Sequence, residues 1–112
     1  MIRRPIVYIA HPLSGDWEGN IASARQYAEA SARNNYAPVA PYLTLYGLLH
    51  EPADRQLGLD IDLAMIEVCD EVWLCGGRIS SGMQIELDHA LEVGVKIRSI
   101  PHPDGIRDME FA

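Results

Sequence analysis

The order of apolar and polar segments predicts an α/β fold with a parallel sheet and helices on both of its faces. Short apolar runs rich in β-branched residues, such as residues 5–10, are typical of strands buried on both faces. Longer segments with apolar or small residues at helical spacing alternate with these runs. This alternation requires crossover connections, which make the strands parallel. The length of 112 residues, 48% of them hydrophobic, predicts one domain over residues 1–112.

Four strands and three main helices are expected. The strands are expected at residues 5–10, 36–41, 70–76 and 95–101. The helices are expected at residues 20–35, about 53–69 and 80–94. Asn20 is a suitable cap for the first helix, and Ser81 with Gln84 has the spacing of a capping box at the start of the third. The segment from Tyr42 to Gly58 is apolar but broken by Gly and Pro, so we expect a long, partly helical connection there.

The composition excludes several classes of partner. A formal net charge of −7 argues against binding to a nucleic acid polymer or an anionic membrane surface. No apolar run approaches the roughly 20 residues of a membrane span, and the first residues lack a signal-peptide core, so we expect a soluble, cytoplasmic protein. Cys69 and Cys75 have no zinc or redox spacing and are expected to be buried free thiols. The histidines have no metal-ligand spacing, so neither a metal site nor a cofactor is expected.

Two Gly- and Ser-rich loops follow the first and third strands, at the edge of a parallel sheet where ligands bind. Ser80, Ser81 and Gly82 at a helix start offer N–H groups and hydroxyls, and Arg78 lies close by, which suits a phosphate. Ser14 and Gly15 form a weaker version in the first loop. The alternative is that the second loop is only a helix cap.

Two carboxylates fall beside apolar helix stripes. At 100° per residue, Glu86 lies on the margin of the stripe formed by Met83, Leu87, Ala90 and Leu91. Asp62 flanks the apolar stripe of the preceding helix, whereas Asp60 and Glu67 point away. Each acid alone could reach water or pair with an arginine, because burying an unpaired carboxylate is costly. Together they indicate paired acids over a cleft, the usual equipment for cleaving a glycosidic bond.

Three stretches carry a family resemblance: "YIAHPLSGD" at residues 8–16, the pattern D-x-x-x-I-x-x-C-D that ends at Asp70, and "SSGMQIELDHA" at 80–90. They resemble the nucleoside 2-deoxyribosyltransferase-like superfamily, which includes the 2′-deoxynucleoside 5′-phosphate N-hydrolases. The resemblance implies a flavodoxin-like three-layer sandwich with a four- to five-stranded parallel sheet. It also implies Glu86 as the catalytic nucleophile, Tyr8 as the strand-one tyrosine of the site, and Asp62 as the second acid, with Asp60 left open.

The implied activity is cleavage of the N-glycosidic bond of a (deoxy)nucleoside or its 5′-monophosphate through a covalent glycosyl-enzyme on Glu86. The sugar then passes to water or to another base. Ser80 favours the hydrolase, because the nucleotide hydrolases resemble the chain there and the free-nucleoside transferases carry an aspartate. The family's E-L-G-Y-A has become "ELDHA", so the small residue after the nucleophile is replaced by Asp88.

Alternatives to this enzyme and to its site residues stay open. The same cleft would serve a non-catalytic nucleotide-binding module, or a flavodoxin-like protein that handles phosphate. His11, directly after the first strand, is expected either to bind the ligand or to hold the loop. Trp17 and either Tyr42 or Tyr46 are candidates for stacking on a base, or for the core.

We also expect a homodimer or a higher homo-oligomer. "PYLTLYGLLHEP" places six large apolar residues within eight positions, more than a short connection over a small core readily buries. Members of the resembling family complete their sites with residues of a neighbouring subunit, which would bring this connection close to a partner's cleft. The alternative is that these side chains all fold inward.

Overall fold

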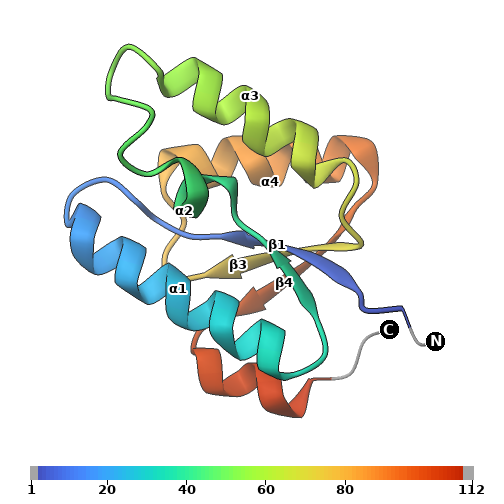
Figure 1. The fold of residues 1–112 in the computed structure, drawn as a ribbon. Helices are drawn as coiled ribbons and strands as arrows, with labels where there is room; N and C mark the ends of the chain where they lie inside the picture. Colours follow the sequence, from blue (N-terminus) through green and yellow to red (C-terminus); the bar gives the residue numbers. More distant parts are fainter. Residues whose placement is uncertain (1–2, 110–112) are drawn as a thin grey trace.

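The computed structural model describes residues 3–109, which contain a four-stranded parallel sheet with helices on both faces (Figure 1). The strand order is β2-β1-β3-β4, and every neighbouring pair is parallel. The strands are β1 (Ile6–Ala10), β2 (Ala37–Val39), β3 (Glu71–Cys75) and β4 (Lys96–Ile100). The predicted α/β class and parallel sheet are confirmed, with the strand number at the lower end of the predicted range.

The helices form two outer layers around the sheet. α3 and α4 lie together on one face, and α1 lies with the C-terminal 3-10 helix η1 on the other (Figure 1). The helices are α1 (Trp17–Arg33), α2 (Pro41–Leu45), α3 (Arg55–Ile66), α4 (Ser81–Val93) and η1 (Pro103–Asp108). η1 was not among the predicted helices, because its Pro103 and Gly105 are typical of a turn.

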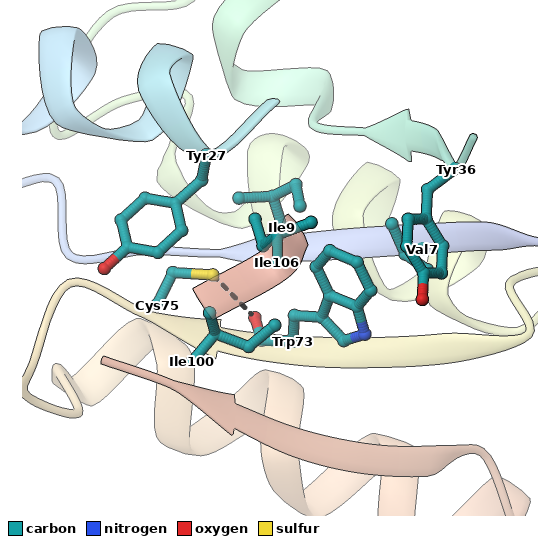
Figure 2. Packing of buried hydrophobic residues seen from close by; sticks show 8 residues of the cluster. All are labelled: Val7, Ile9, Tyr27, Tyr36, Trp73, Cys75, Ile100 and Ile106. Carbon is teal, nitrogen blue, oxygen red and sulfur yellow. Dashed lines mark hydrogen bonds between the residues drawn. The ribbon is translucent and has the colours of Figure 1, made fainter. Parts of the chain in front are cut away.

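Alternate residues of each strand point to opposite faces of the sheet, which produces two cores. Val7 and Ile9 of β1 belong to the cluster beneath α1 and η1, whereas Tyr8 and Ala10 belong to the cluster beneath α3 and α4. In the first cluster the rings of Tyr36 and Trp73 pack edge to face, and their centroids are 4.8 Å apart. Both side chains are drawn in Figure 2. The residue of β1 that sequence similarity singled out, Tyr8, therefore faces the side that α3 and α4 cover.

The capping residues of two helices differ from the predicted ones. α1 begins three residues before Asn20, because Asp16 accepts a hydrogen bond from the Gly19 N–H and serves as the cap. α4 begins at the predicted residue, but its cap is Ser80, whose Oγ accepts the N–H of Met83 at 3.2 Å. The predicted capping box is wrong, since Gln84 donates to Asp88 instead of reaching back to the helix start.

Two expectations about apolar side chains need correction. Leu91 was expected in the buried stripe of α4 but is 66% exposed, while Met83 and Ala90 of that stripe are buried. The apolar connection neither folds fully inward nor lies fully outside. Tyr46 and Leu48 are exposed, and its other four large apolar residues are partly buried: Tyr42, Leu43, Leu45 and Leu49.

The topology places a crevice beside the carboxyl end of β1. From β1 the chain crosses to β2 on one side, and from β3 it crosses to β4 on the other side. The loops that leave β1 and β3 therefore separate, which is the usual position of a ligand site in an open α/β sheet. None of the helices in residues 3–109 is long and apolar enough to cross a bilayer. Cys69 and Cys75 are buried free thiols, as predicted.

Candidate active site

Glu86 is a buried carboxylate on the second turn of α4, with only 5% of its surface exposed. The hydroxyl of Tyr8, which is fully buried on β1, donates a hydrogen bond to its Oε2. Burial, followed by the negative charge of Glu86, raises the pKa of Tyr8 well above its usual value, so this hydroxyl stays protonated as a donor. The structure thus confirms that Glu86 turns inward and gives it one fixed donor.

Asp62, on the third turn of α3, lies beside Glu86 and Tyr8 and interacts with both. Burial raises the pKa of Asp62 to about 6, and its hydrogen bonding with Tyr8 and Glu86 partly offsets that rise. Burial also raises the pKa of Glu86 to about 8, with the charge of Asp62 as the second cause. Around neutral pH the two carboxyls therefore hold about one proton between them. Asp60 is exposed and accepts a hydrogen bond from Gln56, so it is Asp62 that reaches Glu86.

Tyr42 of α2 completes the surroundings of the two acids. Its hydroxyl donates to the carbonyl of Ile9, which joins α2 to the carboxyl-terminal end of β1. Burial, followed by the charge of Glu86, raises the pKa of Tyr42 well above its usual value. The hydroxyl of Tyr42 therefore stays protonated and bonded to the backbone. The side chain of Tyr42 also lines the cleft described next.

A cleft of about 630 Å³ opens above Asp62 and Glu86. This volume lies within the range of small-molecule sites, and most of its walls are apolar or aromatic, as such sites require. One wall comes from the β1–α1 loop and the start of α1, a second from the start of α4, and a third from α2, α3 and the connection between them. The apolar and aromatic lining residues are Leu13, Trp17, Ile21, Tyr42, Leu45, Tyr46, Leu49, Leu59, Met83 and Ile85.

The predicted phosphate loop lies on the second wall. Ser80, Ser81 and Gly82 all line the cleft, and Gly82 has open space beside its Cα. The Oγ of Ser80 accepts a hydrogen bond from the N–H of Met83. Its own O–H remains able to donate a hydrogen bond to a ligand. Arg78 is exposed and does not line the cleft.

The first loop brings His11 and Ser14 to the cleft, but Gly15 does not line it. His11 is 5% exposed, and its Nδ1 donates to the carbonyl of Pro12 at 2.7 Å. Its Nε2 lies 2.9 Å from the hydroxyl of Ser23. Burial lowers the pKa of His11, which keeps the ring neutral so that Nε2 accepts from that hydroxyl. Both nitrogens therefore hold the loop, in line with the second of the two roles expected for His11.

The third wall contains polar residues that the sequence did not single out. Glu51, Asp54, Arg55 and His50 line the cleft together with Gly58 and Leu59, and we call this part of the third wall the outer wall. Of these four, only Arg55 has a signal in helical spacing, because Arg55, Gly58 and Leu59 precede Asp62 by seven, four and three residues and share its face of α3. His50, Glu51 and Asp54 precede the helix and have no such signal. Among residues 3–109, no group of three or more His, Cys, Asp or Glu side chains could hold a metal ion.

Comparisons with known proteins place the fold. No curated protein matches the sequence. A solved structure of the 2-deoxyribosyltransferase from Bacillus psychrosaccharolyticus is similar with a TM-score of 0.68 and 13% identity, covering 95% of this chain and 93% of that one. At that identity the similarity shows a shared fold. The family described as "Domain of unknown function (DUF7768)" matches residues 5–100, and the chain belongs to that family.

Proposed function

We propose that the protein is an enzyme that cleaves the N-glycosidic bond of a nucleoside or nucleoside 5′-monophosphate. The observation that supports this most is the placement of Glu86: a buried carboxylate with one fixed donor, beside a second acid, at the floor of a cleft of small-molecule size. A structural carboxylate in the core would gain nothing from a neighbouring acid, since like charges oppose each other's ionisation. The shared fold with a 2-deoxyribosyltransferase agrees with this assignment.

In the proposed reaction Glu86 attacks C1′ of the sugar, and the bond from C1′ to the base breaks with its electron pair leaving on the base. For this attack the proton that the pair shares passes from Glu86 to Asp62, and Asp62 delivers it to the departing nitrogen. Water then attacks C1′ of the glycosyl ester, Asp62 takes up its proton, and the Glu86 carboxylate is regenerated with net retention. Tyr8 orients Glu86 throughout, because its hydroxyl remains a donor.

The start of α4 is the proposed site of a 5′-phosphate. Glu86 lies five residues after Ser81, which at the rise of an α-helix is about 7.5 Å along the axis. That spacing suits a sugar held with C1′ at Glu86 and its 5′ substituent toward the N–H groups of Ser81 and Gly82. We favour the hydrolase over the transferase on the ground that Ser80, rather than a second carboxylate, faces this part of the cleft.

The proposed active form is a homodimer. Tyr46, Leu48, Leu57 and Ile85 are large apolar residues that are 44–66% exposed, and Tyr46 and Ile85 also line the cleft. A second copy packed on this surface would remove it from water and close the cleft. We therefore expect activity to depend on assembly.

The test is release of free base, followed by chromatography, from a panel of nucleosides and 5′-monophosphates. The proposal expects turnover by the native chain and a loss of at least about a thousandfold in Glu86→Ala. Glu92→Gln, an exposed residue of the same helix, is the matched control and should keep the native rate. Binding of a nucleotide without any turnover would favour the non-catalytic binding module and overturn the enzyme. A cleanly folded Glu86→Ala protein with retained activity would overturn the residue assignment.

A further inference from the structure

The outer wall of the cleft carries a net negative charge, which is unusual beside a floor that already holds two acids. Glu51, Asp54 and Arg55 are its charged side chains. The Nε of Arg55 lies 2.8 Å from Oε2 of Glu51, so these two charges neutralise each other. Asp54 is then the unbalanced charge among the residues of this wall.

Asp54 occupies a capping position without capping its helix. It is the N-cap residue of α3, but its side chain accepts no hydrogen bond from the first turn. Its backbone angles, φ −99° and ψ 9°, differ from the extended conformation that directs a cap side chain toward the helix N–H groups. Instead, Oδ2 accepts the N–H of His50 at 2.9 Å. By contrast, Asp16 and Ser80 both cap their helices. The carboxylate of Asp54 is therefore fixed to the connection and not to the helix.

Asp54 and the two acids lie at opposite ends of one helix face that borders the cleft. Leu59 and Asp54 precede Asp62 by three and eight residues, or about 4.5 and 12 Å along α3. A substrate with C1′ at Glu86 and its 5′ side toward α4 would direct its base along α3, over Gly58 and Leu59. A purine brings the polar edge of its six-membered ring toward Asp54, whereas a pyrimidine stops short of it.

We propose that Asp54 selects the base of the substrate, favouring a purine with an exocyclic amino group over one without. This inference rests on the proposed function for the position of the sugar, but not on turnover. A carboxylate has only acceptors to offer, so it attracts the N–H donors of an amino group and repels a ring carbonyl. A polar site that pairs with a substrate N–H rejects the analogue that lacks it.

The experiment measures binding by calorimetry in the Glu86→Gln background, where catalysis does not interfere. The ligands are the 5′-monophosphates of deoxyguanosine, deoxyadenosine and deoxyinosine, with the free nucleosides in parallel. Deoxyinosine differs from deoxyguanosine only by the missing amino group. The better of the two amino-bearing purines should bind at least about tenfold more tightly than the inosine ligand.

Adding Asp54→Asn should reduce or reverse that preference, because the new amide keeps an acceptor for His50 and presents a donor to the ligand. Asp88→Asn, an exposed residue of α4 outside the cleft, is the matched control and should leave the preference unchanged. Equal binding of all three purines, or a preference that survives Asp54→Asn, would overturn the role of Asp54 and leave the enzyme proposal standing. Selective binding lost in Asp54→Asn, together with no base release by the native chain, would support the base site and overturn the enzyme.

Discussion

Replacing Glu86 with glutamine should make the protein more stable at alkaline pH, and this is the sharpest physical consequence of the buried acid pair. The amide keeps the size of the side chain and an acceptor for the Tyr8 hydroxyl, but it cannot ionise. The native carboxyl has its pKa raised by burial from 4.5 to about 8. Between these two values the unfolded chain has lost the proton and the folded chain still holds it. Native stability therefore falls as pH rises through this window, and the loss is complete above pH 8.

The size of the effect follows from the same shift. At about 1.4 kcal/mol for each tenfold change in proton affinity, a rise of the pKa from 4.5 to about 8 corresponds to at most roughly 5 kcal/mol of unfolding free energy. Because Asp62 shares the proton, we expect a measured difference of about 2 to 4 kcal/mol. Asp62 remains in both proteins, but its own titration changes when Glu86 is replaced, so the difference reports the coupled pair.

Urea unfolding of both proteins at several pH values, followed by the fluorescence of the buried Trp73, measures this difference. The unfolding free energy of Glu86→Gln should exceed that of the native chain at pH 8.5, and the gap should close toward pH 4.5. Glu92→Gln, on the exposed face of α4, should follow the native curve within about 0.5 kcal/mol. Parallel curves for native and Glu86→Gln over the whole range would refute the buried, proton-holding glutamate.

Three further outcomes are expected. Ser80→Ala should weaken the binding of nucleoside monophosphates, measured by calorimetry, more than that of the matching nucleosides. An equal effect on both would mean that this loop only caps the helix and binds no phosphate. Gly76→Ala should lower the unfolding free energy by more than about 1 kcal/mol in urea, because Gly76 has φ +89° and a Cβ would come within 2.8 Å of His11 Nε2 and Pro12 Cδ. Light scattering should show a dimer at micromolar concentration, and a fully active monomer would reject the assembly.

The parallel sheet and the inward position of Glu86 were predictable because each has a local pattern in the sequence. A buried parallel strand must be an apolar run, and a glutamate on the margin of an apolar helix stripe stands out by its spacing. Helical spacing already directs Asp60 away from the apolar stripe, and the choice between Asp62 and Asp60 stayed open only because the family resemblance could match its aspartate to either residue. The structure decides it by directing Asp62 toward Tyr8.

The outer wall of the cleft was not predictable for a different reason. Its position depends on the conformation of the connection between α2 and α3, and no periodicity describes residues 46–54. Asp54 would be assigned to helix capping from sequence alone, because aspartate before a helix usually caps it. The exposure of Leu91 similarly depends on where α3 ends on α4, which helical spacing does not encode.

The most direct test of the central proposal, that Glu86 forms a covalent bond to the sugar, is mass spectrometry of the protein mixed with substrate. A 2′-fluorinated nucleotide slows release of the sugar and lets the intermediate accumulate. The intact mass should rise by one glycosyl group, and fragmentation should place it on Glu86, with no such adduct in Glu86→Gln. An adduct on another residue, or base release by Glu86→Gln at the native rate without any adduct, would contradict the account.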